Sequence, residues 1–277
     1  MRFDWYQATI PENPILLVDS LLARLAPGGE VVEGKGRHNY HQSFTVKTAV
    51  GDRAALVLCG GPNGHPNVTA SGNDTMAFVD HIRANWPEHR VTRFDSAEDF
   101  CEQGAFERIE EVCREVASEC GVKGRAIVPD DLAEGKTYYM GAAASDVRVR
   151  LYDKTAEARR GLPPERASEV PDFWARLEAQ IRPRGDFKAV AAKVPPEVAW
   201  GFAGWTQKLA VRAFAMDVQR IQMKAGRESD DQRAYRYMVM QYGPLLLRML
   251  RDLGSWACVG LTIGEDVERI AREKIQR

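Results

Sequence analysis

The sequence predicts an α+β fold, a curved antiparallel β-sheet with packed helices followed by a C-terminal all-helical segment. Up to about residue 193, strand-like stretches cluster as hairpins and do not alternate strictly with helices, which favours an antiparallel sheet over a Rossmann arrangement. After Pro195-Pro196 the apolar spacing is helical. We therefore expect an α+β domain over residues 1–193 and a helical region over residues 194–277 that packs on it.

The N-terminal part contains short strands and two helices. Strands are expected at residues 5–10, 41–49, 53–58 and 68–70, which lie between turn-forming residues. Pro14 suits the first position of a helix, and Pro27-Gly28-Gly29 ends the apolar stripe that follows it. The polar side chains of residues 71–74 can cap a second helix.

The middle of the chain combines strands with one clear helix. Residues 91–95 look like a strand that ends in an acidic cluster. Residues 105–120 have apolar residues at helical spacing and are predicted to form an amphipathic helix. Further strands are expected at 136–141, 147–154 and 173–182, and helical segments at 198–221, 231–253 and from 266 to the end.

The composition is that of an ordinary soluble globular chain. Its 277 residues are 44% hydrophobic and 28% charged, and 38 basic against 39 acidic residues give a net charge of −1. We expect a cytosolic protein with reduced thiols, because there is no membrane-length apolar run, no signal-peptide pattern and no CxxC pair. The near-zero net charge argues against a polybasic tail, yet the segments 182–193 and 208–227 are locally basic. Phosphate contacts need only such local cations.

The most informative segment is residues 147–154, Val-Arg-Val-Arg-Leu-Tyr-Asp-Lys. In a strand, one face would carry Arg148, Arg150, Tyr152 and Lys154. Three cations around a tyrosine hydroxyl can hold a phosphate and stabilise a forming phenolate, which is what tyrosine attack on phosphorus requires. The alternative is a solvated sheet face with salt bridges to Glu157 and Glu178.

Carboxylates come from three separate predicted strands. Asp95, with Glu98 and Asp99 nearby, follows one strand, Asp153 ends a second and Glu178 lies on a third. Carboxylate oxygens are suitable ligands for Mg²⁺ or Mn²⁺. These ions commonly assist phosphoryl-transfer reactions. The alternative is again surface charge at strand ends.

Four short motifs occur in a recognisable order. They are Val91-Thr92-Arg93-Phe94-Asp95, Tyr138-Tyr139-Met140-Gly141 with Ser145-Asp146, Arg150-Leu151-Tyr152-Asp153-Lys154, and Arg176-Leu177-Glu178. In this order the chain resembles the rolling-circle replication initiators of the Rep_trans type, found in phages, small plasmids and integrative elements. Residues 5–10, 68–74 and Gln241-Tyr242-Gly243 extend the resemblance over most of the chain.

The resemblance implies a metal-dependent enzyme that nicks and rejoins DNA at an origin. Tyr152 matches the tyrosine that attacks the DNA and stays linked to its 5′-phosphate, and Lys154 and Arg150 would neutralise charge at the scissile phosphate. The carboxylates that match ligands of Mg²⁺ or Mn²⁺ are Asp153, Glu178 and Asp95. Basic residues of the same strands and of the stretch after them are the expected DNA contacts: Arg148, Arg176, Arg182, Arg184 and Lys188.

The resemblance also implies partners. They are double-stranded origin DNA, single-stranded DNA, a second copy of the chain and a host helicase, in the cytoplasm of a bacterial host and without a membrane. No Walker A or His-hydrophobe-His motif is present, so neither helicase activity nor the histidine-metal class of tyrosine nickases is expected. The alternatives are a non-catalytic DNA-binding regulator on the same fold, a mobilisation relaxase, and a carbohydrate- or nucleotide-active α+β enzyme.

Overall fold

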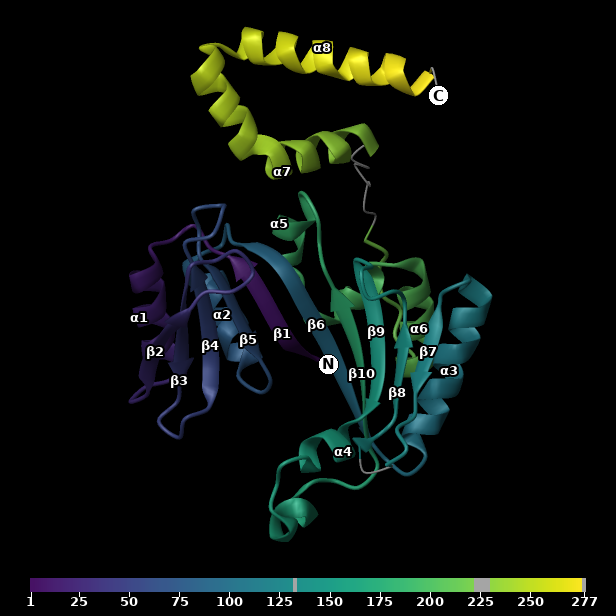
Figure 1. Cartoon of the computed structure of the whole chain (residues 1–277). Coiled ribbons are helices and arrows are strands. Elements are labelled where there is room, and N and C mark those ends of the chain that lie inside the picture. The colour runs from purple at the N-terminus through teal and green to yellow at the C-terminus, as the bar shows by residue number, and fades with distance from the viewer. Residues whose placement is uncertain (132–133, 222–229, 276–277) are drawn as a thin grey trace. The chain divides into compact units, whose positions relative to one another are not determined.

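A computed structural model describes residues 1–131, 134–221 and 230–275, and the chain divides into two compact units (Figure 1). The first unit is Met1–Met223 and the second is Lys224–Arg277. The boundary therefore comes later than the predicted one at residue 193. Residues 196–214 belong to the first unit because their apolar side chains, among them Trp200 and Leu209, are buried in its core.

The first unit is built on one ten-stranded sheet. In chain order the strands are β1 (Arg2–Thr9), β2 (Glu30–Lys35), β3 (Gln42–Lys47), β4 (Arg53–Cys59), β5 (Asn67–Ser71), β6 (Arg90–Cys101), β7 (Gly124–Ile127), β8 (Thr137–Met140), β9 (Val147–Asp153) and β10 (Trp174–Ile181). In space their order is β2-β3-β4-β5-β1-β6-β10-β9-β8-β7, and neighbouring strands are antiparallel. The predicted α+β class with an antiparallel sheet is confirmed.

The first unit also contains helices, and all but those at residues 154–159 and 164–169, none of whose described side chains is buried, pack on the apolar face of the sheet. They are α1 (Pro14–Leu25), α2 (Thr75–Asn85), α3 (Ala105–Cys120), α4 (Lys154–Arg159), α5 (Phe187–Ala191) and α6 (Gly204–Phe214), with 3-10 helices η2 (Pro164–Glu169) and η3 (Pro196–Gly201). The predicted helix over 105–120 is α3, whose stripe of Ile109, Cys113 and Val116 is fully buried. Figure 1 shows α3 beside β7 and β8.

Within the first unit, two sequence expectations were wrong in the boundaries of their elements. The predicted helix over 198–221 is instead η3 followed by α6, because Ala215 takes a left-handed conformation (φ 52°) that ends the helix. The strand predicted to end at residue 95 continues to Cys101, so Asp95 and its neighbouring acids lie inside β6. β6 therefore carries its acids across the middle of the sheet.

The second unit consists of α7 (Asp230–Leu253) and α8 (Trp256–Ile275), joined at Gly254. Pro244 lies inside α7, which bends in Figure 1, as expected where proline removes a helical hydrogen bond. α8 begins ten residues before the predicted start at 266. Within the described ranges of the chain, no helix has the length and apolar character needed to cross a membrane.

Candidate active site

The site lies on the polar face of the sheet, defined here as the face of β6, β8, β9 and β10 that carries charged and aromatic side chains. Arg150 on β9 lies opposite Glu178 on β10, and Tyr152 is two residues further along β9. Gln180 on β10 lies opposite Asp95 on β6. Directly opposed residues of antiparallel strands project to the same face. This face therefore brings together the predicted tyrosine, an arginine and two of the carboxylates.

The opposite face of the same strands fixes this register. Leu151 and Val149 alternate with the polar residues of β9, and Leu177 alternates with those of β10. All three are fully buried in the core. A one-residue slip would expose them and bury the arginines, so the apolar core determines which side chains reach the polar face.

Tyr152 lies under a layer of cations and is only 5% exposed. The guanidinium carbon of Arg150 is 4.1 Å from the Tyr152 ring centroid, and Nζ of Lys154 is 5.8 Å from it. Burial, with the charge of Glu178, raises the pKa of Tyr152, whereas Arg150 and Arg176 oppose this rise. The phenol is therefore protonated at neutral pH, and the surrounding cations would stabilise its anion during a reaction.

Lys154, the third predicted catalytic residue, is the first residue of α4 and no longer part of the strand. Its Nζ pairs with Glu157 and lies 5.7 Å from the Trp174 ring centroid. The ammonium group thus remains beside Tyr152 at the end of β9.

Asp95 and Glu178 form a buried pair of carboxyl groups. Nε of Arg93 donates to Oδ1 of Asp95 at 2.9 Å, and Nη2 of Arg150 donates to Oε2 of Glu178 at 3.0 Å. Burial, together with the charge of Asp95, raises the pKa of Glu178 to about 7. Burial likewise raises the pKa of Asp95 against the opposing effect of Arg93. Two acids held together away from water favour a shared proton or a bound cation.

The chemistry of this pair fits a divalent cation. Mg²⁺ is commonly held by one or two carboxylates, with water and substrate phosphates completing its coordination. Asp95 and Glu178 could supply such a pair. Arg93 and Arg150 already neutralise these acids, so a cation would compete with both guanidinium groups.

Asp153, the third predicted ligand, does not join this pair. It is the N-cap of α4, and its Oδ1 accepts a hydrogen bond from the backbone N–H of Ala156 at 2.9 Å. Its side chain lines a separate cavity at the end of β9. Within the described part of the chain, no three acid, histidine or cysteine side chains are grouped as metal ligands. The three-carboxylate arrangement expected from the sequence is therefore not assembled.

Next to the pair lies a cavity of about 110 Å³, called here the arginine pocket. Its lining side chains and backbone belong to Arg93, Tyr139, Arg148, Val149, Arg150, Glu178 and Gln180. The guanidinium carbon of Arg148 lies 3.9 Å from the Tyr139 ring centroid, and Nε of Arg148 is buried with no hydrogen-bond partner among the described residues. An incoming phosphate oxygen could accept from these arginines.

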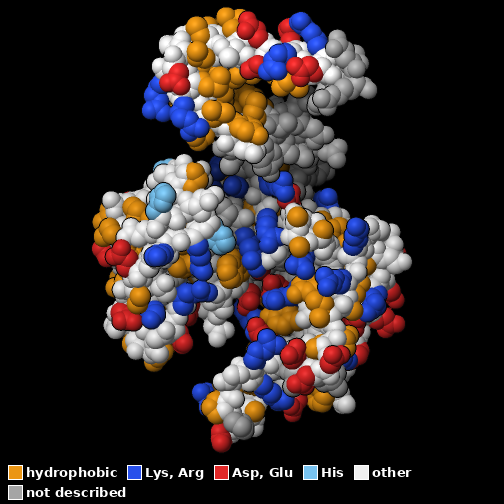
Figure 2. Space-filling view, in the orientation of Figure 1, with side chains coloured by type: hydrophobic (Ala, Val, Ile, Leu, Met, Phe, Trp, Pro, Cys, Tyr) orange, Lys and Arg blue, Asp and Glu red, His pale blue; other side chains and the backbone are white. Residues whose placement is uncertain are grey.

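Two of the predicted DNA contacts lie at or beside this pocket. Arg148 lines it, whereas Arg182 lies outside the lining but near enough that burial together with the charges of Arg93 and Arg148 lowers the pKa of Arg182. Cations that repel one another in this way favour an anion between them. Figure 2 shows Lys and Arg side chains gathered over the central strands of this face.

The remaining predicted DNA contacts differ in their availability. Arg184 is exposed and pairs with Asp146 at 2.7 Å, and Lys188 is half-buried in α5. Arg176 is only 3% exposed. It donates to Asp99 and to Asp4 at 2.6 and 2.7 Å, so its guanidinium holds the sheet together and does not face solvent. The position of Arg176 does not support a role in contacting DNA.

Arg93, Tyr139 and Gln180 were not among the candidates from sequence. Arg93 stacks on Trp5 at 4.5 Å and holds Asp95, and Tyr139 supports Arg148. Both belong to the motifs named above: Arg93 lies two residues before Asp95 on β6, and Tyr139 on β8 lies opposite Arg150 on β9. Strand alternation applied to β6 and β8 would have identified both.

No protein-family model and no curated protein matches the sequence. A solved structure, the rolling circle replication initiator protein from Geobacillus stearothermophilus, is similar with a TM-score of 0.52 and 20% sequence identity. The similarity covers 83% of this chain and 89% of that one. At the level of architecture it confirms the resemblance noted in the sequence: the chain has the fold of a rolling circle replication initiator.

Proposed function

We propose that this protein is a rolling-circle replication initiator that nicks one DNA strand at an origin through Tyr152. The observation that carries the proposal is the position of Tyr152, beside Arg150 and on the same face as the Asp95–Glu178 pair and the arginine pocket. A nucleophile, cations for the developing phosphorane charge and a pair of acids are the components that such a transesterification needs. The shared fold supports the same reading.

In the proposed reaction, the scissile phosphate binds at the arginine pocket. Oη of Tyr152 attacks phosphorus, the bond from phosphorus to the 3′ oxygen breaks, and a 5′-phosphotyrosine link forms. The phenol loses one proton and the departing 3′ oxygen gains one, so the step needs neither water nor a nucleotide. Arg150 and Lys154 would neutralise the charge that builds on the phosphate. Rejoining is the same step in reverse.

We propose that Asp95 and Glu178 hold Mg²⁺ or Mn²⁺, which when bound would withdraw charge from the phosphate oxygens. Arg93 and Arg150 would then be released from the carboxylates and free to bind phosphate. Their planar guanidinium groups match two phosphate oxygens at once. Binding of the cation by Asp95 and Glu178 would therefore favour binding of DNA by the two released arginines.

The test uses supercoiled DNA of the element that encodes the chain, incubated with Mg²⁺ and the full-length protein. A covalent protein–DNA adduct and a nicked circle are expected from the wild type. Tyr152→Phe should form no adduct while binding the duplex nearly as well. Tyr40→Phe, which alters a tyrosine outside the polar face, serves as the matched control and should leave the adduct intact. An adduct from Tyr152→Phe would disprove the assignment.

The second candidate is a non-catalytic DNA-binding regulator on the same fold. It is favoured by one observation, the separation of Asp153 from the Asp95–Glu178 pair. The same experiment separates the two candidates, because a regulator would bind the origin duplex and form no adduct with either wild-type protein or Tyr152→Phe. A mobilisation relaxase would perform the same nicking step on a transfer origin.

A further inference from the structure

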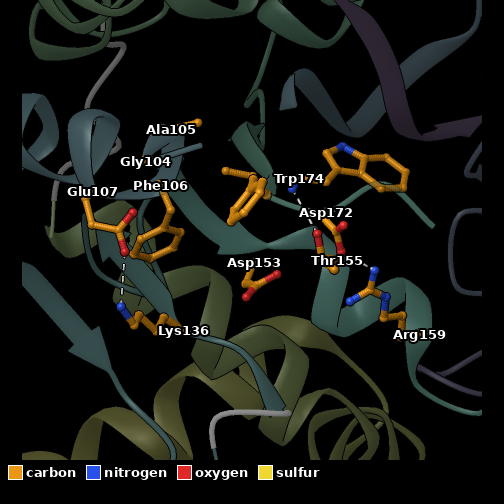
Figure 3. Close-up of a pocket in the computed structure, with 12 residues that line it drawn as sticks. Gly104, Ala105, Phe106, Glu107, Lys136, Asp153, Thr155, Arg159, Asp172 and Trp174 are labelled. Atoms are coloured by element: carbon orange, nitrogen blue, oxygen red, sulfur yellow. Dashed lines mark hydrogen bonds and ion pairs between the residues drawn. The ribbon is translucent and has the colours of Figure 1, made fainter. Parts of the chain in front are cut away.

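A second cavity of about 270 Å³ lies at the end of β9, next to Tyr152 in the chain (Figure 3). We call it the end cavity. The lining residues used below are Phe106, Glu107, Lys136, Asp153 and Phe173. In Figure 3, Asp153 lies at the centre, with Phe106 and Lys136 on one side and Thr155 and Arg159 on the other. None of the proposed nicking chemistry uses this cavity.

The size and rings of the end cavity suit a flat aromatic ligand. A dry cavity of about 150 Å³ already admits benzene, so about 270 Å³ accommodates a single nucleobase. Phe106 lines the cavity and is half-buried, and Phe173 is 57% exposed. Aromatic side chains of this kind are platforms on which unpaired bases stack.

The backbone of Phe173 is an independent indication. Its φ of 58° lies in the left-handed region, which a bulky residue with a β-carbon occupies at a cost. Asparagine or glycine would occupy the same conformation more easily. A strained backbone that holds a large exposed ring at the mouth of a cavity is typical of a binding position.

The wall of the cavity beside Phe173 is fixed by hydrogen bonds. Oγ1 of Thr155 donates to the carbonyl of Pro171 and accepts from the N–H of Trp174, both at 2.8 Å. Arg159 pairs with Asp172 at 2.6 Å. These contacts connect α4 to the start of β10, so the wall of the cavity is held in place by the protein itself.

The polar groups of the cavity define which bases it would accept. One oxygen of Asp153 is used by the Ala156 N–H, which leaves the other oxygen to accept from a ligand. Glu107 pairs with Lys136 at 3.2 Å and is a second acceptor. Carboxylates recognise exocyclic amino groups, such as N4 of cytosine. Thymine has no such group, so it would bind less well than cytosine.

We propose that the end cavity binds one unpaired, amino-bearing base of the DNA strand that Tyr152 attacks. The inference rests on the proposed nicking function for the identity of the strand. Tyr152 and Asp153 are consecutive residues on opposite faces of β9, and Asp153 lines the cavity, so a strand linked at Tyr152 would pass around the end of β9 to place one base there. The base would stack on Phe173 and Phe106 and donate to Asp153.

The test uses the full-length protein and short oligothymidylates with one central 5-iodocytosine. Irradiation should cross-link the base to Phe173 or Phe106, as mapped by mass spectrometry of the peptides. Phe173→Asn keeps the left-handed backbone and removes the ring, so it should fold normally and lose the cross-link. Its affinity for an oligothymidylate with a central cytosine should fall about tenfold, as expected for the loss of one stacked base.

The control is Val50→Asn, which alters an exposed turn between β3 and β4 and should change neither cross-linking nor affinity. Cross-links confined to the polar face, or equal losses in Phe173→Asn and Val50→Asn, would overturn the inference. So would binding of free deoxycytidine monophosphate as tightly as the cytosine oligonucleotide, because the cavity would then be a nucleotide site.

Adduct formation at Tyr152 with Mg²⁺ is measured in parallel. If the adduct forms without a cross-link at Phe173 or Phe106, the base site fails and the nickase stands. If the cross-link forms without an adduct, the nickase fails and the base site stands as a single-stranded DNA contact.

Discussion

Arg150 is the residue on which the site depends most directly. Its guanidinium lies over the Tyr152 ring and donates to Glu178, so a single side chain connects the nucleophile to the acidic pair. A lysine at this position would keep the charge and lose the planar stacking on the Tyr152 ring. The type of cation, and not only its charge, is therefore expected to matter.

We predict that Arg150→Lys lowers the rate of adduct formation about 100-fold, the usual effect of removing one donor from a developing oxyanion. The rate is measured by single-turnover adduct formation on a nicking substrate. Arg24→Lys, on the exposed end of α1, should leave the rate unchanged. An undiminished rate in Arg150→Lys would show that any cation suffices beside Tyr152.

A second prediction for a single residue concerns His89 and the pH dependence of stability. It is buried, its Nε2 lies 2.7 Å from Oη of Tyr6, and its Nδ1 lies 2.6 Å from the carbonyl of Trp86. Burial lowers the pKa of His89 below its ordinary value, against the opposing effect of the hydrogen bond that its ring donates to the carbonyl of Trp86. The unfolded chain therefore takes up a proton at this residue before the folded one does.

Linkage then gives the sign of the pH effect. The stability that His89 contributes is present above its unfolded pKa, near 6.5, and is lost as the pH falls toward the lower folded pKa. When the pH is lowered from about 7.5 to about 5.5, the urea midpoint of the wild type should decrease by more than that of His89→Gln. The exposed His65→Gln should behave like the wild type. Equal slopes in all three proteins would contradict the prediction.

Alternation along a strand was enough to predict the core of the site. The helix cap at the end of that strand could not be predicted in the same way. Arg148, Arg150 and Tyr152 occupy one face of β9 as the sequence indicated. Asp153 follows Tyr152 on the strand, so it projects from the opposite face, where its carboxylate caps α4. The end of a strand depends on the turn that follows it, and nothing in the string Tyr-Asp-Lys specifies a helix at the next residue.

At the scale of elements, β6 shows how ion pairs extend a strand beyond its apolar pattern. The sequence after Asp95 reads as an acidic loop, yet β6 continues because its acids find partners across the sheet. Asp99 accepts from Arg176 at 2.6 Å and from Nε1 of Trp174 at 2.8 Å. These partners lie far away in the sequence, so the length of β6 was not predictable from its own residues.

The same reasoning explains which elements were identified and which were missed. α3 was predicted with its bounds because a buried stripe repeats over four turns of helix. The edge strands β2 and β7 were missed because their residues are mostly exposed and lack an alternating pattern. An edge strand is stabilised largely by backbone pairing with its single neighbour, which leaves little signal in the side chains.

We predict that Arg176→Ala destabilises the junction of β6 and β10 by about 3 kcal/mol, because it leaves Asp99 and Asp4 without their buried cation. Arg184→Ala removes an exposed pair and should change the free energy of unfolding by less than about 0.5 kcal/mol. Urea titration compares the two variants. Equal stability would show that the Arg176 network contributes nothing net.

At the scale of the whole molecule, the second unit differs from the first in its surface. The first unit has a large buried apolar core, whereas most of the described apolar residues of α7 and α8 are exposed. These include Leu245, Leu247, Trp256, Leu261 and Val267. Such a concentration of exposed apolar residues usually marks an interaction surface.

We predict that the chain forms a dimer through α7 and α8, as judged by light scattering. Leu261→Asp combined with Val267→Asp should shift the mass to that of a monomer, whereas Val50→Asp in the first unit should leave the mass unchanged. A monomeric wild type, or a dimer that survives the double substitution, would contradict this. The formation of DNA adduct by the monomeric variant would show whether one copy suffices for nicking.

The place of β9 inside the sheet has a mechanical consequence. β9 pairs along its whole length with β10 on one side and over residues 149–152 with β8 on the other, so it is not an edge strand. If Tyr152 holds the 5′ end of a DNA strand while replication pulls on it, the tension passes from the tyrosine into β9. There it is shared by two ladders of backbone hydrogen bonds loaded in shear, so the anchor resists being unzipped one bond at a time.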